Sequence, residues 1–201
     1  GRVVGLAAED ESGEEVRVKA RAVIIATGGF GDNPEMINRY TEYEYGRNLF
    51  SMRIPGMAGE GIRMAWEAGA APTFMNMEII YGVLGQMDPA GIDVVARQPN
   101  LLVNLLGERF IDEGIMGNNS YTGNAIAMQK GGCAFIIFDE AIKERYRTVG
   151  VDMPWPVYPL TRLENIDEDI RKAFAREKNA MFAADSIEEL AEKTGIDKNG
   201  L

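Results

Sequence analysis

The residues of this chain that point most directly to chemistry are small ones in a row. Val23 to Ala26 is a short apolar run with β-branched residues, and Gly28, Gly29 and Gly31 follow it closely. Because glycine has no Cβ, the backbone there can take positive φ and let a ligand touch the main chain. The alternative interpretation is a plain tight turn, since these glycines do not have the six-residue spacing typical of dinucleotide sites.

The elements expected around this glycine turn are a strand before it and a helix after it. The apolar run predicts a strand buried on both faces. Asn33, Pro34 and Glu35 then supply an N-cap, a first-turn proline and an early acid, which together predict a helix start. A strand, a glycine turn and a helix N-terminus in this order can form an anion or nucleotide site.

The remaining elements follow from periodicity. Alternation predicts a hairpin of residues 3–9 and 15–20, joined by the turn Glu11 to Glu14. Helices are expected at 34–44, 61–68, 119–130, 140–147, 167–178 and 187–193, and strands at 74–78, 101–104, 134–138 and 180–183. The prolines of the stretch Asp152 to Pro159 exclude regular helix there, because each fixes φ and removes a donor.

Several motifs in a fixed order resemble fumarate reductase and succinate dehydrogenase type flavoproteins. They are Val18–Asn33, Gly59–Ala65 with Glu67–Ala71, Leu102–Asn104 with Gly107–Glu113, and Ala134–Glu140. The resemblance implies an α+β fold of the cap type. Residues 1–33 would be the end segment of an FAD-binding domain, and residues 34–201 the cap domain that covers the substrate. The family's N-terminal dinucleotide-binding unit and C-terminal segment have no counterpart here, so we expect a piece of a longer parent, inactive by itself.

The same resemblance implies a cofactor and partners. FAD would exchange hydride with a small-molecule substrate. The missing segments of the parent chain would complete the site, and an electron-donor protein is a possible partner. The implied FAD contacts are Ala26, Thr27, Gly28, Gly29, Ala58, Gly59, Glu60 and Gly61. Glu60 departs from the usual Asp. For Gly59 to Gly61 the alternative is a simple turn before an amphipathic helix.

Two departures from the family bear on the substrate. Fumarate reductases resemble the run Asn76 to Tyr81 and then supply a substrate-binding histidine, whereas this chain has no histidine. They also place a proton-delivering arginine shortly after the motif that begins here at Arg109, yet none lies between Glu113 and Tyr121. A dicarboxylate needs cationic or strong donor groups at both ends. We therefore expect a less anionic substrate than fumarate or succinate.

Three residues are candidates for direct contact with that substrate. Tyr121 is the candidate proton donor, because a phenol can donate to a developing enolate-like charge. The alternatives are a tyrosine that packs on the adjacent helix with its hydroxyl in water, and a donor in the C-terminal part of the parent. Glu78 and Arg97 are candidate substrate contacts. Arg109 and Glu113 match family positions, although a pair so close in sequence more often forms a structural ion pair.

Composition limits the partners. A formal net charge of −10 argues against nucleic acid, and acids gather at predicted helix starts such as the capping box Ser186 to Glu189. A single cysteine, Cys133, excludes an internal disulfide and a cysteine-cluster metal site, so we expect no metal. No apolar run has transmembrane length, which leaves cytoplasm or periplasm as expected locations. The competing class of function is a non-catalytic ligand-binding or interaction module that kept the flavoprotein cap fold.

Overall fold

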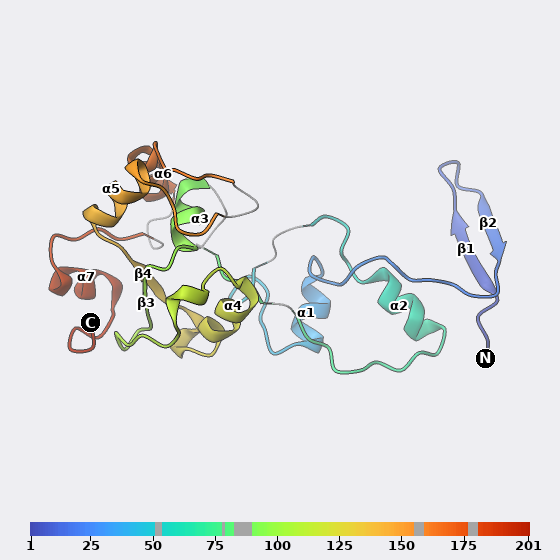
Figure 1. The fold of residues 1–201 in the computed structure, drawn as a ribbon. Coiled ribbons are helices and arrows are strands. Elements are labelled where there is room, and N and C mark those ends of the chain that lie inside the picture. The colour runs from blue at the N-terminus through green and yellow to red at the C-terminus, as the bar shows by residue number, and fades with distance from the viewer. Residues whose placement is uncertain (51–53, 78, 83–89, 155–158, 177–180) are drawn as a thin grey trace. The chain divides into compact units, whose positions relative to one another are not determined.

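The computed structural model describes residues 1–50, 54–77, 79–82, 90–154, 159–176 and 181–201 (Figure 1). The chain divides into two compact units, Gly1–Met77 and Glu78–Leu201. Helices and strands occur in both units, which agrees with a mixed α and β fold. The division expected after residue 33 concerns the domains of a larger protein and stays a prediction.

The first unit begins with the predicted hairpin. β1 (Gly5–Glu9) pairs antiparallel with β2 (Glu15–Lys19), and Leu6 lies opposite Val18. The turn is held by the Asp10 carboxylate, which accepts two backbone amide hydrogen bonds at 2.8 and 3.0 Å. Leu6 and Val18 are each 48% exposed, so the apolar face of this two-stranded ribbon is largely open.

α1 (Pro34–Tyr40) begins where the sequence predicts. Asn33 Oδ1 accepts a hydrogen bond from the Met36 amide at 3.0 Å, as an N-cap should. The helix ends at Tyr40 and not at the predicted Glu44. The reason is local, because Thr41 leaves the helix with extended backbone and its hydroxyl donates to the Ile37 carbonyl at 2.7 Å.

The core of the first unit forms around α1 and α2 (Glu60–Glu67). Phe30, Met36 and Ile37 are buried, and partly buried residues such as Trp66 from α2 pack against them. These contacts explain why the short helix α1 is stable, since burial of an apolar face contributes more than intrinsic propensity in a helix of two turns.

The buried strand predicted at Val23 to Ala26 is wrong. Residues 22–29 form neither helix nor strand, and Ile24 is 90% exposed. A strand buried on both faces needs an adjacent strand to pair with its backbone N–H and C=O groups, and it needs other elements packed over both faces to cover its side chains. The described strands of this unit, β1 and β2, pair with each other and leave this run without a ladder partner.

The second unit contains the remaining elements. They are α3 (Ala90–Ala96), β3 (Leu101–Val103), η1 (Glu113–Ile115), α4 (Asn119–Ala127), η2 (Lys130–Gly132), β4 (Phe135–Ile137), α5 (Glu140–Thr148), α6 (Ile166–Arg176) and α7 (Ile187–Thr194). β3 and β4 pair antiparallel, with Leu102 opposite Ile136. The sequence predicted both strands and helices α4 to α7, with ends that differ by a few residues.

α3 is the element that the sequence analysis missed. All of its residues after Ala90 are buried, and Val94 and Val95 form a core cluster with Tyr146, Leu163 and Ile166. Its contact with α6 is close, because a Cβ at Gly91 would overlap the carboxylate of Asp169. A helix buried almost completely has no solvent-exposed polar face, so its sequence lacks the periodicity that reveals an amphipathic helix.

Other expectations also need correction. No strand forms in the described parts of the predicted strands, 74–77 and 181–183, while Glu78 and Ala180 lie outside the described residues. α4 ends at Ala127 and not at Lys130; the short turn η2 follows, in which Gly131 has φ 75°. The N-cap half of the predicted capping box is confirmed, since Ser186 Oγ accepts from the Glu189 amide at 3.2 Å, while the Glu189 carboxylate accepts from the Asp185 amide at 3.0 Å. Residues 155–158 of the proline-containing loop are outside the described part. None of the described helices is long and apolar enough to cross a bilayer.

Candidate functional site

The two glycine segments predicted to contact the cofactor lie together in the first unit. The Asp32 amide donates to the Met57 carbonyl at 3.0 Å, and Asn33 Nδ2 donates to the Ala58 carbonyl at 2.8 Å. The approach is closest at Gly61, where a Cβ would overlap Thr27 Oγ1 and Ile25 Cγ2. The structure therefore brings Thr27 and Gly61 into contact, although they are far apart in the sequence.

The glycines in this site have different reasons to be glycine. Gly59, with φ 80°, begins α2, and its Cβ would lie 2.6 Å from Met36 Sδ. Gly59 and Gly61 are buried and are accounted for by close packing within the chain. Gly28 has φ 75° but is exposed, as are Ala26 and Thr27, while Gly29 is half-buried. The main chain of residues 26–28 is therefore open to a ligand.

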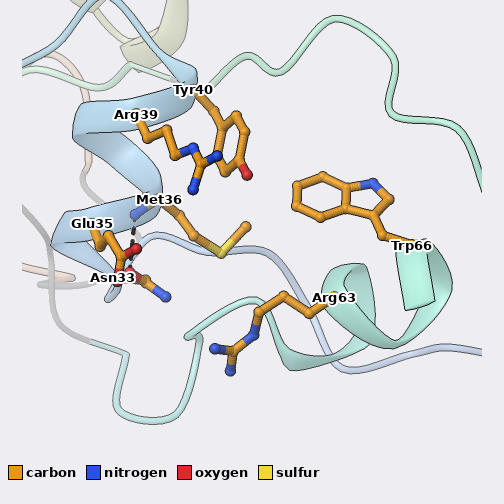
Figure 2. Close-up of a pocket in the computed structure, with 7 residues that line it drawn as sticks. All are labelled: Asn33, Glu35, Met36, Arg39, Tyr40, Arg63 and Trp66. Atoms are coloured by element: carbon orange, nitrogen blue, oxygen red, sulfur yellow. Dashed lines mark hydrogen bonds between the residues drawn. The ribbon is translucent and has the colours of Figure 1, made fainter.

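A cavity of about 180 Å³ lies between α1 and α2 (Figure 2). Its lining residues are Asn33, Glu35, Met36, Arg39, Tyr40, Arg63 and Trp66. Met36 connects the cavity to the cofactor segment, since its sulfur packs beside Gly59. None of the residues predicted as site residues lines this cavity. The signal available in the sequence was Arg63 and Trp66 three residues apart on one predicted helix, which places them on one face.

In the second unit, Arg97 is held inside a polar cluster. Its Nε and Nη2 donate to the two oxygens of Asp93 at 3.1 Å each, and the side chains are only 3% and 1% exposed. Its Nη1 donates to Asn119 Oδ1 at 2.7 Å, and Nη2 also reaches the Tyr81 carbonyl at 3.3 Å. The guanidinium carbon lies 5.0 Å from the centre of the Tyr81 ring.

Tyr81 completes the cluster. Its hydroxyl donates to the Met116 carbonyl at 3.0 Å, and burial raises the pKa of Tyr81 to about 12. A phenol that holds its proton so firmly is a structural donor here. Asp93 and Asn119 were not singled out from the sequence, because the helix α3 that brings Asp93 beside Arg97 was itself not predicted.

Tyr121, the candidate proton donor, lies in the first turn of α4. Its side chain is 52% exposed, and its backbone amide donates to the N-cap Asn118 at 3.0 Å. The next residue, Thr122, is fully buried, and its hydroxyl has no hydrogen-bond partner among the described residues. Glu78, the second candidate substrate contact, lies outside the described residues.

Arg109 and Glu113 form an ion pair, the structural alternative that the sequence left open. Glu113 is buried and also accepts a hydrogen bond from the Leu102 amide at 3.2 Å. The hydrogen bond from Arg109 lowers the pKa of Glu113 to about 2, although burial acts in the opposite direction. This carboxylate ties η1 to β3.

Cys133 is half-buried, and burial raises the pKa of its thiol. No group of three or more metal-binding side chains occurs in the described parts of the chain.

Comparison with known proteins adds to this geometry. The sequence profile of a family described as FAD binding domain matches residues 1–198. The chain belongs to this family. FAD is accordingly its cofactor, and the resemblance to fumarate reductase type flavoproteins is confirmed.

Relatives of this FAD binding domain chain include reductases named for different substrates. A vinyl phenol reductase from Lactiplantibacillus plantarum is 32% identical over 209 residues, which cover 96% of this chain and 41% of the relative. A urocanate reductase from Eggerthella lenta is 34% identical over 144 residues, covering 70% and 23%. A fumarate reductase (cytochrome) from Shewanella frigidimarina is 32% identical over 128 residues, covering 63% and 22%. The chain thus spans less than half the length of these relatives.

Proposed function

We propose that this chain is part of a flavin-dependent oxidoreductase that reduces, or in the reverse direction forms, a carbon–carbon double bond in a small organic substrate. Family membership supports the cofactor, and the names of the relatives support a reductase of unsaturated compounds. The observation that carries the proposal is the contact of Thr27 with Gly61, because it joins the two segments that resemble the flavin-binding motifs.

The residues present fit the cofactor. The exposed main chain of Ala26, Thr27 and Gly28, with Gly29 beside it, would hold FAD without side chains in the way. Ala58, Gly59, Glu60 and Gly61 would form the second contact, at the N-terminus of α2. When bound, FAD supplies the hydride chemistry. The chain itself must then bind and orient the substrate, exclude water and deliver a proton.

Tyr121 is the proton donor that we propose within this chain. Its exposure leaves the phenol free to meet a substrate, and no strong hydrogen bond of its hydroxyl is recorded in the described structure. Substrate contact by Glu78 and Arg97 remains a prediction. Arg97 already gives hydrogen bonds to Asp93, Asn119 and Tyr81, so any contact with substrate would have to compete with these.

The substrate that we propose is less anionic than fumarate. The chain has no histidine, and no arginine follows Glu113 before Tyr121, so two cationic or donor groups of the fumarate reductases are missing. Vinyl phenols carry no carboxylate and illustrate the class.

The alternative is a non-catalytic binding module. For the domain roles we propose residues 1–33 as the end of the FAD domain and 34–201 as the cap, completed by other segments of a longer parent and served by an electron-donor protein.

The visible absorption spectrum of the protein from the complete reading frame tests this function. We expect a flavin spectrum, and reoxidation of the reduced flavin by enones or vinyl phenols faster than by fumarate. A colourless protein that also takes up no added FAD would favour the binding module. Flavin reoxidised fastest by fumarate would overturn the substrate class and leave the flavin assignment intact.

A further inference from the structure

The cavity between α1 and α2 has the side chains of an anion site. Figure 2 shows Arg39 extending from α1 and Arg63 from α2, with the side chain of Met36 between them, Tyr40 beside Arg39 and Trp66 across from Tyr40 on α2. We propose that this cavity binds a small organic acid or phosphate ester, with its oxyanion between Arg39 and Arg63 and its apolar part against the aromatic rings. The proposal is independent of the function proposed above.

The first support is the lack of a carboxylate partner for either arginine. No ion pair with a carboxylate is recorded for Arg39 or Arg63 within the described residues, although the chain carries 31 acids against 21 lysines and arginines. Exposed arginines elsewhere do pair, as Arg47 does with Glu44 at 2.7 Å. A guanidinium offers a rigid fork of donors that matches carboxylate and phosphate oxygens.

The position of Arg63 is the second support. It is the fourth residue of α2, in the turn where the partial positive charge of the helix disfavours a cation. Arg39, in the last turn of α1, is favoured by its own helix and has a structural reason to be basic. Arg63 is not favoured in this way, and a bound anion would offset the repulsion between its charge and the helix N-terminus.

The walls set the kind of molecule that fits. Tyr40 and Trp66 meet edge to face, with ring centroids 5.3 Å apart and an interplanar angle of 63°. Arg39 Cζ lies 5.3 Å from the centre of the Tyr40 ring, so cation and aromatic surface are adjacent. A volume of about 180 Å³ is below that of pockets for drug-sized ligands, roughly 300–1,000 Å³, and suits a single small acid.

Glu35 is the internal competitor. It also lines the cavity, and it precedes Arg39 by four residues on α1, a spacing that permits an ion pair. In the described part of the chain, the structure shows no ion pair between Glu35 and Arg39, and the carboxylate of Glu35 repels an incoming anion. Removal of this charge should therefore strengthen anion binding, whereas removal of either arginine should weaken it.

Trp66 fluorescence provides the assay. The chain has two tryptophans, so Trp155→Phe leaves Trp66 as the reporter. Sodium benzoate and sodium phosphate are titrated separately, with sodium chloride at matched ionic strength as the reference. We expect a saturable change with at least one oxyanion. Binding should weaken about tenfold in Arg63→Gln and Arg39→Gln, the equivalent of one charge-assisted hydrogen bond.

The controls decide between a site and general charge effects. Arg47→Gln, at an exposed arginine of the same unit, should bind as the parent does, and Glu35→Gln should bind more tightly. Saturation with benzoate alone identifies a carboxylate with an apolar part, and saturation with phosphate alone a phosphoryl group. The proposal is overturned if chloride gives the same change, if neither oxyanion saturates, or if both arginine variants bind like the parent.

Discussion

Breaking the buried pair of Asp93 and Arg97 should destabilise the second unit strongly. The two side chains are 1% and 3% exposed, so neither charge can regain water without unfolding. Removal of one partner of such a pair typically costs about 3–5 kcal/mol, a large part of the roughly 5–15 kcal/mol that stabilises a domain. Arg97→Met should be the worse single variant, because it also leaves the oxygens of Asn119 and Tyr81 without their donor.

The double variant carries the decisive information. Asp93→Ala with Arg97→Met leaves no unpaired charge, so it should lose less stability than the sum of the two single variants by about 3 kcal/mol. Urea unfolding followed by circular dichroism gives the four free energies of unfolding. Free energies that add within about 0.5 kcal/mol would mean that the two charges are not coupled, and the reasoning from burial would fail.

Gly28→Val in the complete protein should abolish flavin absorbance, because a side chain would cover main chain that we assign to FAD and strain a residue at φ 75°; retained flavin would place the site elsewhere. Gly61→Ala should cost about 1–3 kcal/mol by overlap with Thr27 and Ile25, measured by urea unfolding, whereas Gly82→Ala, which meets open space, should cost far less. For Glu113, the ion pair lowers the pKa of the carboxyl from its ordinary 4.5 to about 2. The pair therefore contributes its full stability above the pKa of the unfolded chain, and this contribution is lost as pH falls through the pKa of the folded chain. The stability difference between the parent and Glu113→Gln should therefore shrink between pH 5 and pH 2; a difference independent of pH would contradict the assignment.

Local signals in the sequence were sufficient where a short segment determines its own structure. Asn33 and Pro34 fixed the start of α1, Ser186 and Glu189 that of α7, and alternation identified the hairpin. In each case the hydrogen bonds close within a few residues, so no knowledge of the rest of the fold was needed.

Prediction failed where the outcome depends on distant neighbours. The run Val23 to Ala26 has the composition of a buried strand, but composition cannot supply the adjacent strand that would make it one. α3 was missed for the related reason that burial on every side removes the polar stripe.

The candidate site was partly predictable. Motif resemblance predicted two segments to contact the flavin, and the structure placed Thr27 of one against Gly61 of the other. The arginine pocket was not predictable, because Arg39 and Arg63 belong to different helices whose packing no local pattern reveals.

The contact at Gly61 has an evolutionary consequence. Because its missing side chain leaves the space occupied by Thr27 and Ile25, a larger residue at position 61 is tolerable only if one of those two positions becomes smaller. In proteins that share this arrangement, the three positions should vary together in side-chain volume. The loop before α2 and the segment before α1 would thus change together during evolution, and their covariation would mark the surface that we propose to bind flavin even where the residues themselves differ.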